Sequence, residues 1–275
     1  MASKAFAPAN ISCVFKIYQH KDPRWMGSYG FGFTINEGVI AKVSKAKRNE
    51  IAFNGASIKF PAVISVISNL TREKIKVNIK SKLPLGCGFG LSGASALATA
   101  YAINGLLKLK KSNKELGIIA HTADAENRTG LGDVVNQFHG GFCIKLKPSS
   151  HFEVKKIDFQ DINIYCRYFS KVSTKSVITN IKIRNKINDA ADDSLRKIYS
   201  LRKNKIQFKD IIKISKEFSA NSGLLKDKKT METIKNIEEN SGNASMIMLG
   251  NAVFSDKMFE GASGYKISNQ GAYLL

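Results

Sequence analysis

Apolar and polar residues alternate along several short segments of the chain, and this period of two predicts β-strands. Residues 5–19 and 31–46 show the alternation, and Pro8 is expected to break the first strand because proline cannot donate to a ladder. Residues 74–80 alternate strictly, which predicts a half-buried antiparallel strand. Further strands are expected at residues 141–146, in two parts of 151–170, around a Gly-Asn turn within 244–254, and at 271–275.

Helical spacing of apolar residues appears in the intervening segments. Residues 92–107 are rich in alanine and place apolar side chains at helical intervals. Residues 113–127 follow Ser112, which with Glu115 predicts a capping box. A short helix is expected after residue 133, and residues 186–240 are expected to be mainly helical. The pattern predicts an α+β protein, divided into an N-terminal domain at 1–168 and a C-terminal domain at 169–275.

Length and composition are those of a soluble globular protein. The 275 residues are 43% apolar and 24% charged, which is enough to form one large domain or two modest ones. The longest mainly apolar stretch, residues 94–107, is too short to span a bilayer, and the N-terminus shows no secretion leader. We therefore expect a cytoplasmic protein whose four cysteines are reduced and buried.

The formal net charge of +21 is large, but its distribution does not favour nucleic-acid binding. A nucleic-acid surface gathers lysine and arginine into a stripe with interleaved aromatic residues. Here most of the basic residues are lysines scattered along the whole chain. We interpret the charge as a solvated surface that also attracts anionic substrates, and a nucleic-acid-binding module remains a remote alternative.

A glycine-rich segment, residues 84–96 (PLGCGFGLSGASA), stands between a predicted strand and a predicted helix. Glycines at alternate positions (Gly86, Gly88 and Gly90) let the backbone approach an anion closely. The free N–H groups and positive dipole end of the following helix favour phosphate binding. The segment lacks the lysine of a Walker A loop and the third glycine of a dinucleotide-binding fingerprint. It therefore predicts a different kind of phosphate-binding loop.

This segment resembles the second signature motif of the GHMP kinase superfamily. Residues 5–12 (AFAPANIS) resemble the first motif and residues 246–254 (MIMLGNAVF) the third, so the resemblance covers nearly the whole chain. It implies an N-terminal domain like ribosomal protein S5 domain 2, a C-terminal ferredoxin-like domain, and the cofactors ATP and Mg²⁺. Leu91 departs from the serine found in many members. The residues that the resemblance assigns to the nucleotide are Pro84, Gly86, Gly88, Gly90, Ser92, Gly93, Ala94 and Ser95, with Ser92 also facing the metal.

Candidate acid–base and metal-binding groups lie in residues 120–137 (AHTADAENRTGLGDVVNQ). His121, Asp124 and Arg128 have the spacing of one helix face. Asp133 follows a Gly-Leu-Gly turn, where spacing alone leaves open a helix N-cap or an acid that points into a cleft. The GHMP resemblance implies that Asp133 is the general base. It also implies that Asp124 binds Mg²⁺, with Glu126 as the rival ligand.

Within the superfamily, three segments are most similar to the archaeal-type pantoate kinases. They are residues 22–33 (DPRWMGSYGFGF), 129–141 (TGLGDVVNQFHGG) and 173–177 (STKSV). This resemblance implies phosphorylation of the primary hydroxyl of D-pantoate to 4-phosphopantoate, in coenzyme A biosynthesis, by a homodimer. It places Ser28 and His121 near the substrate, and Lys145 or Arg24 would pair with its carboxylate. The alternative is another GHMP kinase, acting on homoserine, shikimate or mevalonate.

Overall fold

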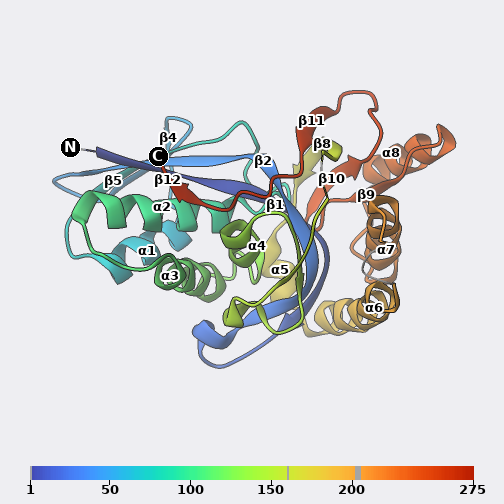
Figure 1. The fold of residues 1–275 in the computed structure, drawn as a ribbon, viewed down its shortest axis with the longest axis horizontal. Coiled ribbons are helices and arrows are strands. Elements are labelled where there is room, and N and C mark those ends of the chain that lie inside the picture. Colours follow the sequence, from blue (N-terminus) through green and yellow to red (C-terminus); the bar gives the residue numbers. More distant parts are fainter. Residues whose placement is uncertain (1, 160, 202–205) are drawn as a thin grey trace.

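The computed structural model describes residues 2–159, 161–201 and 206–275, and its strands form two sheets (Figure 1). The larger sheet has the order β12-β1-β2-β5-β3-β4, and β6 extends it by pairing with β2 and β7. The smaller sheet has the order β11-β8-β10-β9. Larger-sheet strands are β1 (Ala2–Tyr18), β2 (Gly27–Lys45), β3 (Glu50–Phe53), β4 (Ala56–Ser57), β5 (Ile75–Lys80), β6 (Phe142–Lys145), β7 (Lys155–Ile157) and β12 (Tyr273–Leu274). Smaller-sheet strands are β8 (Asn163–Lys171), β9 (Ala244–Met246), β10 (Gly250–Ser255) and β11 (Ser263–Lys266).

The long antiparallel pair β1–β2 corrects the expectation that Pro8 ends a strand. The strand continues through Pro8, which lies opposite Gly38, and the register shifts before Asn10 pairs with Thr34. A bulge of this kind tolerates proline because the ladder is already interrupted there. Gly38 is needed for the close approach, since a Cβ on it would lie 2.2 Å from the carbonyl oxygen of Ala7.

Helices α1 (Pro61–Leu70), α2 (Leu91–Leu107), α3 (Asn113–Glu126) and α4 (Asp133–His139) cover one face of the larger sheet (Figure 1). Helix α2 packs against β1, β2, α1 and α3, and its small alanine side chains allow it to be buried on nearly all sides. The predicted capping box of α3 is confirmed, because Ser112 and Glu115 satisfy each other's backbone N–H groups. The sequence patterns for α2, α3 and α4 are borne out, whereas α1 was not predicted from the sequence.

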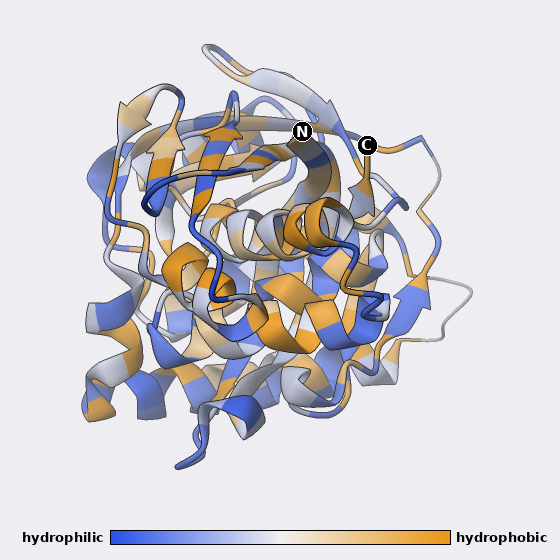
Figure 2. Cartoon of the chain, turned by 90° about the vertical axis from the view of Figure 1, so that its left-hand side faces the viewer, coloured by the Kyte–Doolittle hydropathy of each residue, from blue (hydrophilic) through white to orange (hydrophobic). Residues whose placement is uncertain are grey.

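The second half of the chain supplies the remaining helices, which confirms the helical pattern of residues 186–240 outside the undescribed residues 202–205. They are α5 (Thr174–Thr179), α6 (Ile181–Ser200), α7 (Phe208–Asn221) and α8 (Lys228–Glu239). Two short 3₁₀ helices, η1 (Pro23–Trp25) and η2 (Ser149–His151), follow β1 and β6. Helices α6 and α7 pack against β1, and α8 packs against β9 and β10. Helices α6, α7 and α8 each bury a stripe of mainly apolar residues and expose polar ones. The helices in the foreground of Figure 2 likewise mix hydrophobic and hydrophilic residues.

The α+β class is confirmed, and the end of the chain returns to the first sheet. Strand β12 pairs with β1 through Ala5–Leu274 and Phe6–Tyr273, as the C-terminal pattern predicts. The division into domains at residue 168 stays a prediction, and β8 runs across that position. Within the described ranges, no helix is long and apolar enough to cross a bilayer. The four cysteines are buried free thiols, as expected.

Candidate active site

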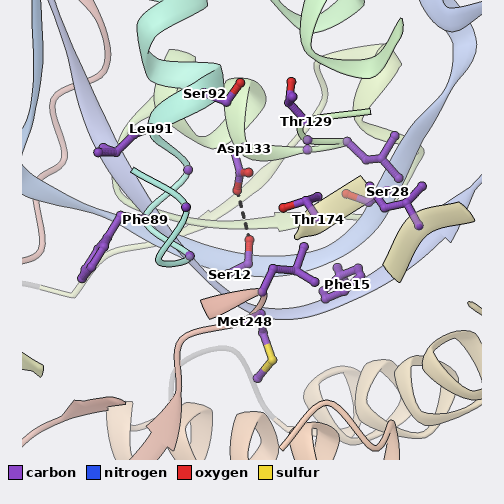
Figure 3. Close-up of a pocket in the computed structure, with 18 residues that line it drawn as sticks. Ser12, Phe15, Ser28, Phe89, Leu91, Ser92, Thr129, Asp133, Thr174 and Met248 are labelled. Carbon is purple, nitrogen blue, oxygen red and sulfur yellow. Dashed lines mark hydrogen bonds between the residues drawn. The ribbon is translucent and has the colours of Figure 1, made fainter. Parts of the chain in front are cut away.

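A cavity opens where the glycine-rich loop, the Gly-Leu-Gly-Asp turn, the middle of β1 and the start of α5 meet (Figure 3). Segments that are far apart in the sequence therefore share one site. The residues that line it are Ser12, Phe15, Ser28, Gly86, Gly88, Phe89, Gly90, Leu91, Ser92, Thr129, Gly130, Leu131, Gly132, Asp133, Thr174, Ile178, Met248 and Leu249.

The glycine-rich loop is held in its shape by positive φ angles and by close backbone packing. Gly86, Gly88 and Gly90 have φ values of 80°, 86° and 62°, which L side chains rarely adopt. A Cβ on Gly88 would lie 2.8 Å from the carbonyl oxygen of Met248, so the third predicted motif packs directly on the second. Helix α2 begins at Leu91 after Gly90, and its first N–H groups have no partner within the helix. This arrangement suits a bound phosphate.

Of the residues assigned to the nucleotide, Gly86, Gly88, Gly90 and Ser92 line the cavity. The other four lie outside its lining. Pro84 precedes the loop and is half-buried, whereas Gly93, Ala94 and Ser95 lie inside the first turns of α2 and are buried. The latter three provide backbone and small side chains that let α2 approach its neighbours closely.

Asp124 accepts hydrogen bonds from two hydroxyl groups whose residues, Ser92 and Thr129, line the cavity, while its own side chain is not part of the lining. Ser92 Oγ donates to Asp124 Oδ1 at 2.8 Å, and Thr129 Oγ1 donates to the same oxygen at 2.6 Å. The Asp124 side chain is buried, and burial raises its pKa to about 7, against the opposing effect of the Thr129 hydrogen bond. Because both hydroxyl protons point to Asp124, the oxygen lone pairs of Ser92 and Thr129 are available to a cation in the cavity.

Asp133 is the first residue of α4, and its side chain is not a helix cap. Gly132 occupies the N-cap position. The carboxylate of Asp133 instead accepts hydrogen bonds at Oδ1 from Asn10 Nδ2 at 2.6 Å and Ser12 Oγ at 3.2 Å. Burial raises the pKa of Asp133, whereas Lys145 and these two hydrogen bonds lower it. The alternative in which Asp133 only caps a helix is therefore wrong, and the acid faces the cavity (Figure 3).

Lys145 lies behind the turn that carries Asp133. Its side chain is buried, its Nζ donates to the carbonyl oxygen of Gly132 at 3.3 Å, and burial lowers its pKa. A Cβ on Gly132 would lie 2.2 Å from Ser28 Oγ and 2.8 Å from Lys145 Nζ. Only glycine therefore fits at position 132. The Ser28 hydroxyl and the Lys145 ammonium group both lie against this residue, next to Asp133.

The other predicted site residues lie away from the cavity. His121 is buried in α3, where its Nε2 lies 2.9 Å from the Met26 carbonyl oxygen and burial lowers its pKa to about 4. Arg24 is exposed and forms an ion pair with Asp22, with Nη2 and Oδ2 2.5 Å apart. Glu126 is exposed at the end of α3. The expected shared helix face of His121, Asp124 and Arg128 is wrong, because α3 ends at Glu126 and Arg128 has a φ of 57°.

Comparisons with known proteins identify the family of the chain. The model of the GHMP kinases N-terminal domain matches residues 59–141. The pantoate kinase of Methanocaldococcus jannaschii is 34% identical over 254 residues, which cover 90% of each chain. The chain belongs to the archaeal-type pantoate kinase family of the GHMP kinases. The pantoate kinase of Methanospirillum hungatei JF-1 is 28% identical, over 91% of this chain and 86% of the relative.

A solved structure confirms the GHMP kinase fold. A phosphotransferase related to the CoA biosynthesis pathway superposes with a TM-score of 0.86 at 21% sequence identity, over 100% of this chain and 98% of the other. At that identity the likeness establishes the fold alone. The family model ends at residue 141, so the GHMP fold of the second half rests on the full-length relatives and on this superposition.

Sequence reasoning missed several residues of this GHMP kinase site. Asn10 and Ser12 were visible only as parts of the first motif, although two polar residues in the most buried part of a strand are a signal in themselves. Thr129 and Thr174 lie in segments that resemble the pantoate kinases, but that resemblance assigns them no role. Leu249, with a φ of 63°, was not recognisable as part of the cavity, because nothing local marks an aliphatic residue as a turn.

Proposed function

We propose that the protein is an ATP-dependent kinase that transfers the γ-phosphoryl group of ATP to the primary hydroxyl of D-pantoate, giving 4-phosphopantoate and ADP. The relatives named as pantoate kinases support the choice of acceptor. The observation that carries the proposal is that Asp133 faces the same cavity as Gly86, Gly88 and Gly90. A base and a phosphate-binding loop that line the same cavity are what a phosphoryl transfer to a hydroxyl requires.

Asp133 accepts the proton of the acceptor hydroxyl in this proposal. Its Oδ1 already receives hydrogen bonds from Asn10 and Ser12, so Oδ2 is left for the substrate. The proton moves to Asp133 as the hydroxyl oxygen bonds to the γ-phosphorus and the bond to the ADP oxygen breaks. Burial raises the pKa of Asp133 and makes it a stronger base than an exposed aspartate.

The oxygen atoms around Asp124 fit Mg²⁺, which prefers oxygen ligands and keeps phosphate and water in its remaining positions. In the described part of the chain, no group of three or more His, Cys, Asp or Glu side chains could hold a metal by itself. One carboxylate with the hydroxyls of Ser92 and Thr129 suits an ion that arrives with ATP. Asp124, Ser92 and Thr129 would hold Mg²⁺, which neutralises charge on the transferred phosphoryl group when bound.

Lys145 and Ser28 are the groups we propose for the carboxylate of the acceptor. Lys145 carries a buried cation whose only hydrogen bond in the described residues is to the Gly132 carbonyl oxygen, and Ser28 offers a hydroxyl beside it. Arg24 is a weaker candidate because Asp22 already neutralises it. His121 would act on the substrate only indirectly, through the Met26 carbonyl and the segment that leads to Ser28.

The test is a coupled ADP-release assay across candidate acceptors. Purified protein with ATP and Mg²⁺ is offered D-pantoate, homoserine, mevalonate and shikimate in turn. We expect kcat/KM for D-pantoate to exceed that for the other three by at least about tenfold, because a site built for one pattern of polar groups rejects others strongly. A preference for one of the other three acceptors would refute the proposal. A cytoplasmic homodimer is proposed as well, and light scattering of the purified protein tests the dimer.

A further inference from the structure

A second cleft adjoins the active-site cavity, with Ile178 lining both. The segment around η1, the end of α3, and the junction of α5 and α6 enclose it. Three cations, Lys21, Arg128 and Arg184, and one acid, Glu126, line this cleft. We call the cleft with these four charged residues the cationic vestibule.

The three cations of the vestibule have no charged partner among the described residues. In the described residues none of Lys21, Arg128 and Arg184 forms an ion pair or a side-chain hydrogen bond. The neighbouring Arg24, by contrast, is neutralised by Asp22. Glu126 is also without an ion pair among the residues described, so it offsets one of the three positive charges. The vestibule therefore keeps a net positive potential beside the cavity.

The backbone of Arg128 is held in the turn that joins α3 to Thr129. It adopts a φ of 57°, a left-handed conformation that costs a non-glycine residue about 1 kcal/mol or more. Its own N–H donates to the Ala125 carbonyl oxygen at 3.0 Å, and the N–H of Thr129 donates to the Asp124 carbonyl oxygen at 3.1 Å. The guanidinium is thus carried on the residue next to Thr129, whose side chain binds Asp124. A charge so placed is well positioned to act on ligands that enter the cavity.

We infer that the cationic vestibule is a recruitment site for the carboxylate of the acceptor substrate. This rests on the proposed function, in which the acceptor is a small hydroxy acid. A positive potential beside the cavity raises the local concentration of an anion and so lowers its KM, whereas the chemical step at Asp133 is unaffected. Mobile salt screens exposed charges, with a Debye length of about 10 Å at 0.1 M and about 3 Å at 1 M. The vestibule therefore contributes most at low ionic strength.

The test compares Arg128→Asn, Arg184→Gln and the double variant with a matched control. Asparagine tolerates the left-handed conformation of Arg128, so the turn is kept. Lys108→Asn is the control, because Lys108 is an exposed cation with a φ of 52° at the far end of α2. At low salt we expect each vestibule variant to raise the KM for D-pantoate by about twofold to fivefold with kcat unchanged. Lys108→Asn should leave both unchanged, and the difference should fade at high salt.

Glu126→Gln should change the KM for D-pantoate in the opposite direction. Removal of the acid makes the vestibule more positive, so the KM for D-pantoate should fall at low salt by a similar factor. Three results would overturn the inference: an unchanged KM in the double variant, a rise that persists at high salt, or an equal rise in Lys108→Asn. Turnover of D-pantoate by the unaltered protein reports separately on the proposed function. If the unaltered protein turns over D-pantoate and the vestibule variants leave its KM unchanged, only the role of the vestibule is refuted. If the unaltered protein does not turn over D-pantoate, the proposed function and the role of the vestibule are both refuted.

Discussion

Asn10 holds the carboxylate of Asp133 through a 2.6 Å hydrogen bond that joins residues 123 positions apart. The amide of Asn10 is itself oriented, because Asn136 Nδ2 donates to Asn10 Oδ1 at 2.9 Å. With its oxygen occupied in this way, Asn10 must present Nδ2 to Asp133. Asn10 and Asn136 are both fully buried, so the arrangement has no competition from water. Asn136 is therefore a positioning residue for the base.

Asn136→Leu tests this relay. Leucine has a similar size but cannot donate, so the Asn10 amide is free to rotate away from Asp133. We expect kcat with D-pantoate to fall about tenfold, the scale of one lost hydrogen bond to a charged group. Because the Asn10 hydrogen bond lowers the pKa of Asp133, its loss raises that pKa and moves the acid limb of the kcat profile to higher pH. A lower kcat with an unshifted limb would indicate only a packing defect.

Removal of the Lys145 charge should also shift the acid limb of the kcat profile, through electrostatics rather than through a hydrogen bond. Its ammonium group favours the ionised form of Asp133, so Lys145→Met raises the pKa of Asp133 and moves the acid limb to higher pH. Lys145→Arg keeps the charge and should retain the position of the limb, even if its KM for D-pantoate changes. The measurement is kcat against pH for the three proteins. An acid limb at the same pH in Lys145→Met and the unaltered protein would contradict the electrostatic coupling between Lys145 and Asp133.

The choice between Asp124 and Glu126 as the metal ligand can be made by Mg²⁺ titration. Asp124→Asn should raise the Mg²⁺ concentration for half-maximal activity by about 10- to 100-fold, because it removes the charge and releases the Ser92 and Thr129 hydroxyls. Glu126→Gln is the control, since its side chain is exposed at the end of α3 and, among the described residues, it accepts no hydrogen bond from Ser92 or Thr129. If Glu126→Gln raised the requirement and Asp124→Asn did not, the assignment would be reversed.

Gly88 and Gly55 separate conformational strain from close packing. Both have positive φ, 86° and 87°, but a Cβ on Gly88 would meet Met248 and Ile247 at 2.8 Å, whereas nothing lies within 4 Å of one on Gly55. Gly55→Ala should cost about 1 kcal/mol of stability and leave activity intact. Gly88→Ala should in addition displace the phosphate loop and raise the KM for ATP by about tenfold or more. Comparable KM values for ATP in the two variants would refute the role of the loop.

Periodicity predicted most of the elements because it reports which face of each is buried. The capping box at Ser112 and the helix at residues 91–107 are local features, and both were found. Pro8 was misread because its tolerance depends on a bulge opposite Gly38, which only the pairing of two strands reveals. The end of α3 was predicted to within one residue, but Arg128 was wrongly placed on its face, because the left-handed turn at Arg128 has no local signal such as glycine.

The candidate site was predictable where chemistry is concentrated in a short motif. The glycine-rich loop and the turn ending at Asp133 are of this kind. The partners of Asp133 were not, because Asn10 lies on a distant strand and its role appears only when β1 and α4 come together. The separation of His121 from the cavity likewise depends on the Met26 carbonyl, which no sequence pattern connects with it.

The most direct test of the central claim is turnover of D-pantoate by Asp133→Asn. Asparagine keeps the size of the side chain but cannot take a proton. The account predicts that ATP-dependent formation of 4-phosphopantoate, followed by mass spectrometry, proceeds readily with the unaltered protein and falls about 100-fold or more in the variant. Nucleotide binding, measured by calorimetry, should be retained. Near-normal turnover in Asp133→Asn would contradict the assignment of Asp133 as the base.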